Sequence, residues 1–139
     1  TSFIGREQGK EYVGTGTNLH GIIAGVYLAL LGPRGLCELG EGIMQRTRYA
    51  MSQLASIPGV DVKAAAGHQF KEFVISFTRS GKTVAEVNQG LLQRGIAGGH
   101  HLGRELPDLG ESALYCVTEI HTQADIDRLC QVLREVVCT

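Results

Sequence analysis

Two neighbouring histidines are the first residues of this sequence that could do chemistry. His100 and His101 follow Gly98-Gly99 and precede Arg104. Adjacent side chains on an extended segment point to opposite faces, so the two imidazoles cannot readily bind one metal ion. The sequence offers no second pair of His, Cys or Asp residues at ligand spacing to support them. We therefore expect no metal site, although one of the two histidines could line a pocket.

A second candidate is the segment Thr118-Glu119-Ile120-His121, where a predicted strand meets a predicted helix. Glu119 and His121 could act as an acid–base pair. Polar residues at such a junction are equally explained by solvation of a loop. We favour the solvation interpretation, and we predict no catalytic residue in this chain.

The cysteines and lysines offer no clear reactive group. The four cysteines form no C-x-x-C pair, and we expect free, buried or half-buried thiols in a reducing cytoplasm. They are Cys37, Cys116, Cys130 and Cys138. The four lysines occur in loop-like or solvent-facing contexts, without the apolar surroundings that activate a lysine for Schiff-base chemistry. They are Lys10, Lys63, Lys71 and Lys82.

The first half of the sequence predicts a loop and then two helices. Residues 1–17 are polar and glycine-rich, and their Gly14-Thr15-Gly16 run lacks the further residues of a phosphate loop, so we expect a linker. Residues 18–31 are apolar nearly all round, which is typical of a helix buried on most sides. Gly32-Pro33 should end this helix and begin a longer one, which Pro58-Gly59 should terminate.

The second half predicts a small sheet and two further helices. Strands are expected at 60–63, 70–77, 96–102 and 114–118. Thr83 with Glu86 forms a capping-box pattern, and Thr122 with Asp125 resembles another cap. The hairpin-like pairing of the last two strands predicts an α+β fold. In this fold a mostly antiparallel sheet carries helices on one face, and a long N-terminal helix pair precedes it.

The composition narrows the possible functions. Thirteen basic and fourteen acidic residues give a net charge of -1, so we expect no nucleic-acid partner. We also expect no membrane partner, because polybasic runs are absent and the apolar stretch 21–31 is too short to span a bilayer. The chain begins with Thr1 rather than Met, and its first helix is too apolar for a small sheet to cover. We therefore expect a fragment whose missing neighbour covers that helix.

An ordered set of segments resembles one family over nearly the whole length from Thr17 to Val137. The segments are Thr17-Asn18, Tyr27-Leu28-Ala29-Leu30-Leu31-Gly32-Pro33, Gly35-Leu36, Phe70, Glu72-Phe73, Gly95-Ile96-Ala97-Gly98-Gly99, Leu102-Gly103-Arg104, Leu114, Cys116-Val117-Thr118-Glu119, Thr122, Asp125-Ile126-Asp127 and Leu129. They resemble the C-terminal part of subunit 1 of the two-subunit glycine decarboxylase, the P-protein of the glycine cleavage system. Gly16 and Leu19 depart from the family's usual Cys and Gln.

The resemblance implies a fold and a function. The fold would be the small C-terminal domain of fold-type I pyridoxal-phosphate (PLP) enzymes, covering residues 18–139. The parent would be a cytoplasmic oxidoreductase, glycine dehydrogenase (decarboxylating), which decarboxylates glycine and passes the aminomethyl group to the lipoyl H-protein. Subunit 2 would carry PLP on its lysine, so this chain would be structural, with no catalytic or cofactor-binding residue.

The resemblance also implies partners and a few site residues. The partners would be the chain's own large domain, subunit 2 and the H-protein, and the isolated chain could self-associate. Thr17, Asn18 and Arg104 are the residues that we expect near the substrate region. The alternatives are a free-standing α+β module that binds a small amino acid, and a purely structural interaction domain.

Overall fold

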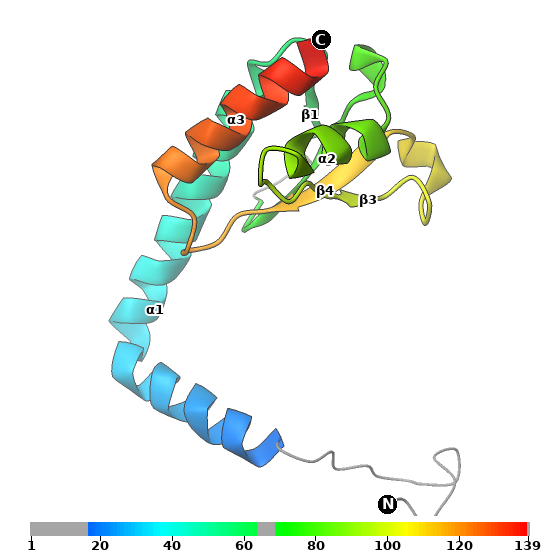
Figure 1. Ribbon diagram of the computed structural model, residues 1–139. Coiled ribbons are helices and arrows are strands. Elements are labelled where there is room, and N and C mark those ends of the chain that lie inside the picture. Colours follow the sequence, from blue (N-terminus) through cyan, green and yellow to red (C-terminus); the bar gives the residue numbers. More distant parts are fainter. Residues whose placement is uncertain (1–16, 64–68, 139) are drawn as a thin grey trace, which may run out of the picture. The chain divides into compact units, whose positions relative to one another are not determined.

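The computed structural model describes residues 17–63 and 69–138, which form parts of two compact units (Figure 1). The first unit is Thr1–Cys37 and the second is Glu38–Thr139. The predicted linker, its Gly14-Thr15-Gly16 run and Lys10 lie outside the described residues.

Helix α1 (Thr17–Ala55) contains a break at Gly32, as the sequence predicts. Gly32 has φ 60° and ψ -177°, a conformation that favours glycine because a side chain would be strained there. Pro33 follows and lacks the backbone N–H that the first turn of a new helix leaves unpaired. The label α1 therefore covers two successive helical segments.

The first segment of α1 exposes nearly all of its large apolar side chains. Leu30 is 81% exposed, and the side chains from Leu19 to Leu28 are between 49% and 63% exposed. The exposed set in this segment is Leu19, Ile22, Ile23, Val26, Tyr27, Leu28 and Leu30. Apolar side chains lie on all sides of this helical segment. Such a composition is typical of a helix that other parts of a protein enclose.

By length and composition alone, the helix Asn18–Ala55 would suffice to cross a membrane. The break at Gly32 divides it. The segment before the break, 18–31, would extend about 21 Å at 1.5 Å per residue, which is shorter than the roughly 30 Å hydrocarbon core of a bilayer.

The second unit contains a four-stranded sheet with strand order β1-β2-β4-β3. The strands are β1 (Asp61–Lys63), β2 (Glu72–Ser76), β3 (His100–His101) and β4 (Ser112–Cys116). All three neighbouring pairs are antiparallel. The pairing of β3 with β4 confirms the predicted hairpin, although β3 is much shorter than the predicted strand at 96–102.

Helices α2 (Val84–Leu92) and α3 (Gln123–Cys138) begin at the predicted caps. In α2 the Thr83 side chain accepts a hydrogen bond from the Glu86 backbone, and the Glu86 carboxylate accepts one from the Thr83 backbone. Gly95 has φ 73° just beyond α2, and the Ile96 backbone N–H bonds back to the Leu91 carbonyl, which ends the helix. Two short 3₁₀ helices, Thr78–Ser80 and Pro107–Leu109, complete the second unit.

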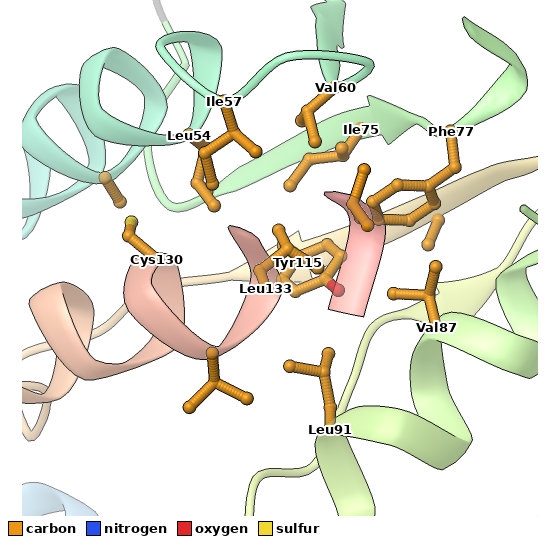
Figure 2. Close-up of a cluster of buried hydrophobic side chains, with 14 of the residues drawn as sticks. Leu54, Ile57, Val60, Ile75, Phe77, Val87, Leu91, Tyr115, Cys130 and Leu133 are labelled. Atoms are coloured by element: carbon orange, nitrogen blue, oxygen red, sulfur yellow. The ribbon is translucent and has the colours of Figure 1, made fainter. Parts of the chain in front are cut away.

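The core of the second unit lies on one face of the sheet (Figure 2). Phe73 and Ile75 of β2 stand opposite Tyr115 and Ala113 of β4, and all four side chains are buried. The helices supply further members of this cluster, including Leu54, Val87, Leu91 and Leu133. Glu72 and Cys116, which alternate with these strand residues, are exposed. This arrangement is the predicted α+β fold with helices on one face of an antiparallel sheet.

The predicted burial of the cysteines is wrong for three of the four. Cys130 is buried on α3 and packs in the core. Cys37, Cys116 and Cys138 are exposed free thiols. Cys116 occupies a position in β4 whose side chain points away from the helices, and the apolar residues beside it in sequence gave no sign of this.

Gly99→Ala should destabilise the second unit, because backbone and ring approach this glycine closely. An added Cβ would lie 2.5 Å from the Tyr115 ring and 2.8 Å from the Leu114 carbonyl oxygen. We expect the free energy of unfolding to fall by about 1–3 kcal/mol, as measured by urea denaturation. Gly40→Ala is the matched control, since Gly40 lies within α1 with nothing within 4 Å of an added Cβ. That change should raise stability by about 0.5–1 kcal/mol, and equal effects at both sites would contradict the prediction.

Candidate functional site

A cavity of about 330 Å³ lies where β4 passes into α3, beside the segment that follows α2. Its walls are largely apolar and include Phe73, Tyr115, Ile96 and Leu129. Burial raises the pKa of Tyr115 to about 12, against a smaller opposing effect of the Gly99 backbone, so this wall residue is neutral at physiological pH. Four further ionisable side chains line the cavity, namely Cys116, His121, Asp125 and Arg128.

His121 is held in place by the turn that precedes α3. Its Nδ1 accepts a hydrogen bond from the Thr118 backbone N–H at 3.0 Å, and the Thr118 hydroxyl lies 3.3 Å from the same nitrogen. Because Nδ1 is an acceptor, the neutral ring carries its proton on Nε2. Glu119, the other half of the conceivable acid–base pair, is exposed and does not line the cavity. The structure therefore gives His121 a local hydrogen bond to Thr118 rather than a contact with Glu119.

Asp125 closes the cap at the start of α3. Its Oδ2 accepts hydrogen bonds from the Thr122 hydroxyl at 2.6 Å and the Thr122 backbone N–H at 2.8 Å. These two bonds, the hydroxyl first, hold the pKa of Asp125 below its ordinary value of 3.8, and the charges of His121 and Arg128 act in the same direction. Asp125 therefore remains ionised throughout the physiological range.

Arg128 lies one turn further along α3 and carries the positive charge of this group. One of its terminal nitrogens donates to the Arg94 carbonyl oxygen at 2.9 Å, which fixes the guanidinium beside Gly95. Residues three apart on a helix are neighbours, so Asp125 and Arg128 lie on the same face of α3. A planar guanidinium has five donors, so one bond to Arg94 leaves others for a ligand.

The Asp125 cap should make stability depend on pH. Since the folded pKa of Asp125 is depressed, its stabilising effect is complete above the unfolded value near 3.8 and is lost as pH falls through the folded value. We expect the stability gap between the parent chain and Asp125→Asn to be present at pH 7 and to shrink below pH 3.8, as measured by urea denaturation. Thr122→Ala removes the hydroxyl that contributes most to the shift, so it should flatten this pH dependence. A gap that stays constant down to pH 2 would contradict the assignment.

Arg104 lies in the turn after β3 and lines a second cavity, of about 360 Å³. His100 and His101 line the same cavity, but they pair with different carboxylates. His100 Nε2 lies 3.3 Å from Glu105 Oε1, and His101 Nε2 lies 3.9 Å from Glu111 Oε2. The two histidines thus have separate carboxylate partners.

The three residues predicted for the substrate region fall in different units. Helix α1 begins at Thr17, and Asn18 is exposed in its first turn. Both belong to the first unit, whereas Arg104 belongs to the second. Their role near a substrate stays a prediction.

The described residues do not provide a covalent site for PLP or a cluster of metal ligands. Lys63 lies 3.9 Å from the Asp61 carboxylate with half of its side chain exposed, and Lys71 is exposed. Lys82 is half-buried near the start of α2, and neither cavity above is lined by any of these three lysines. A Schiff-base lysine needs a pocket that excludes water around its amine, so these lysines do not fit that role. Within residues 17–63 and 69–138, His, Cys, Asp and Glu side chains do not gather in a group of three or more that could hold a metal ion.

Comparison with known proteins shows what this chain is similar to. A protein of Staphylothermus marinus named "Probable glycine dehydrogenase (decarboxylating) subunit 1" is 40% identical over 134 residues, which is 96% of this chain. The chain is homologous to part of glycine dehydrogenase (decarboxylating) subunit 1. Subunit 1 proteins of Pyrococcus abyssi and Thermomicrobium roseum are 34% and 36% identical over 96% and 95% of the chain. No family model matches the sequence.

The homology covers a limited part of the subunit 1 relatives. The chain spans 28% of the length of the Staphylothermus and Pyrococcus proteins and 29% of the Thermomicrobium protein. A crystal structure of glycine decarboxylase, the P-protein of the glycine cleavage system, in inhibitor-bound form matches 94% of this chain with a TM-score of 0.79 and 29% identity. The match covers 29% of that protein. The sequence comparison and the structure comparison therefore both find similarity to glycine decarboxylase proteins.

Proposed function

We propose that this chain serves as a structural domain of glycine dehydrogenase (decarboxylating) subunit 1. The observation that carries the proposal is the 40% identity over 96% of the chain to a subunit 1 protein of which it spans 28%. The match to a glycine decarboxylase crystal structure supports it independently. The parent complex would decarboxylate glycine with PLP and transfer the aminomethyl group to the lipoyl group of the H-protein. When bound, PLP would supply the electron sink for the decarboxylation.

In this proposal the chain supports a site that lies elsewhere in the complex. The lysines of the second unit do not fit a Schiff base, in keeping with a cofactor lysine on subunit 2. The apolar first segment of α1 would be enclosed by the remainder of subunit 1 and would help to form the interface with subunit 2. A cytoplasmic location is part of the same proposal, since exposed free thiols such as Cys37 and Cys138 persist in a reducing compartment.

Reconstitution tests the enzymatic part of the proposal. The gene region that encodes this chain would be expressed with its neighbouring reading frames and a subunit 2, and release of CO₂ from glycine would be measured with PLP and H-protein. We expect release to require the segment that corresponds to residues 18–139. Full release after deletion of that segment, with subunit 2 still present, would refute a structural role.

Borohydride reduction tests the cofactor assignment. The chain is incubated with PLP, reduced and examined by mass spectrometry, with subunit 2 as the positive control. We expect a stable adduct on subunit 2 and none at the stoichiometry of a specific site on Lys63, Lys71 or Lys82. A stoichiometric adduct on one of these lysines would overturn the proposal that the cofactor belongs to subunit 2.

The alternative function is a free-standing α+β module that binds a small amino acid. The observation that favours this alternative is a cavity lined by charged as well as apolar side chains. The DNA upstream of the Thr1 codon separates the two. A reading frame that continues into a long α/β region supports the subunit 1 domain, whereas a start codon and ribosome-binding site directly upstream support the module.

A further inference from the structure

We infer that the cavity between β4 and α3 is a binding site for a small zwitterionic α-amino acid with an apolar side chain. The inference goes beyond the proposed function, because it assigns a ligand to a cavity that lies wholly within the second unit. It holds for a domain of a longer enzyme and for an independent module alike.

The charges around the cavity favour a zwitterion. Arg128 offers guanidinium donors that match a carboxylate, and one of its terminal nitrogens donates to the Arg94 carbonyl oxygen beside the cavity. Asp125 offers a carboxylate that can accept from an ammonium group, since its cap bonds to Thr122 engage only Oδ2. A simple anion would be attracted by Arg128 but repelled by Asp125, and a simple cation would meet the opposite pair of forces. A ligand whose ammonium and carboxylate groups are attached to the same carbon can pair with both side chains.

His121 adds a further polar group to the same cavity. The Thr118 backbone N–H occupies Nδ1, so the neutral ring presents an N–H at Nε2. His121 lines the same cavity as Arg128. Two donor groups and one acceptor group therefore surround a single space, which is the polar requirement of an α-amino acid.

The lining and the volume of the cavity indicate which kind of side chain the ligand carries. Phe73, Tyr115, Ile96 and Leu129 present apolar surface to the cavity. A volume of about 330 Å³ lies at the low end of small-molecule sites, which suits an aliphatic amino acid better than a nucleotide or a peptide. Glycine has the two charged groups but no side chain to cover these walls, so it should bind less tightly than leucine.

Titration of the isotopically labelled chain tests the inference by NMR. The probes are L-leucine, glycine, 4-methylpentanoate without the ammonium group, and isopentylamine without the carboxylate, each up to about 20 mM. We expect saturable shifts for L-leucine at the amide signals of Gly95, Ile96, Ala97 and Val117. Glycine and the two singly charged analogues should each bind at least about tenfold more weakly, because each lacks one of the three contacts.

Variants on α3 connect binding to the named side chains. Arg128→Gln should weaken L-leucine binding at least about tenfold, whereas Arg134→Gln on the same helix should leave it unchanged, since Arg134 does not line this cavity. Asp125→Asn removes the negative charge but keeps an oxygen for the cap, so it provides a second folded variant with the same expected loss.

Three results would overturn the inference. They are absence of saturable L-leucine shifts, binding that Arg128→Gln and Asp125→Asn both leave intact, and equal binding of glycine and L-leucine. None of these results bears on whether the parent complex decarboxylates glycine, which the reconstitution measures separately.

Discussion

Phe77→Ala should reduce the free energy of unfolding of the second unit by about 3–5 kcal/mol. Phe77 is 0% exposed and lies at the end of β2, within the cluster that also contains Ile75 and Val87 (Figure 2). Its backbone N–H donates to the Glu111 carbonyl oxygen at 2.8 Å, so the backbone cannot easily shift to fill the space of the missing ring. The cost therefore includes both lost apolar burial and a residual cavity.

The expected loss is a large share of the total stability, because domains of this size are stable by about 5–15 kcal/mol. Urea denaturation followed by circular dichroism would measure it. Phe70→Ala is the matched control, since Phe70 lies just before β2 and is 49% exposed. We expect Phe70→Ala to cost less than about 1 kcal/mol. Equal losses for the two variants would mean that the ring of Phe77 is not part of the core.

The sequence predicted the elements whose ends are set by residues only a few positions apart. Gly32-Pro33 ended one helical segment and began another, and Thr83 with Glu86 began α2, because each signal satisfies backbone groups within a few residues. The strand predicted at 70–77 contains β2, in which the alternating residues Phe73 and Ile75 are both buried. Signals of this kind do not depend on what the rest of the chain does.

Features that depend on distant partners were predicted less well. Strand β3 covers His100 and His101 alone, because the preceding Gly98 and Gly99 are in close contact with Asn88 and Tyr115 rather than in the ladder. On α3 Cys130 and Val137 are buried, whereas the neighbouring positions Leu129 and Val136 are only partly buried. Which of two adjacent helix positions is buried depends on the elements that pack against the helix. The sequence pattern does not contain that information.

The candidate site was missed in part because its members are separated in sequence. Asp125 was predicted only as a helix cap, and Arg128 was not singled out. Their spacing of three residues on a predicted helix was the available signal, since it sets two opposite charges side by side. The apolar walls come from β2, β4 and the segment after α2, and only the folded sheet brings these together.

Three acidic substitutions on the first segment of α1 should abolish self-association of the chain. Ile22, Val26 and Leu30 recur at four-residue steps, so they form one stripe of the helix, and each is more than half exposed. An exposed apolar surface of this kind promotes contact between copies of a chain when no other protein covers it. We therefore expect the parent chain to form oligomers whose size increases with concentration.

The combined variant Ile22→Glu, Val26→Glu and Leu30→Glu should be monomeric. Burial of each large apolar side chain contributes about 1.5–3 kcal/mol, so the three changes should weaken association by at least about 100-fold. Sedimentation velocity over a range of concentrations would measure the effect, and circular dichroism would verify that the helix persists, since glutamate is a good helix former.

The control carries the same charge change on exposed positions of the second unit, as Ser52→Glu, Gln89→Glu and Ala124→Glu. If net charge alone kept the copies apart, this control would also be monomeric, and the apolar stripe would have no special role. A parent chain that stays monomeric at the highest concentration would equally contradict the prediction. Retention of self-association in the control and its loss in the stripe variant would identify this helix as the surface through which copies of the chain associate.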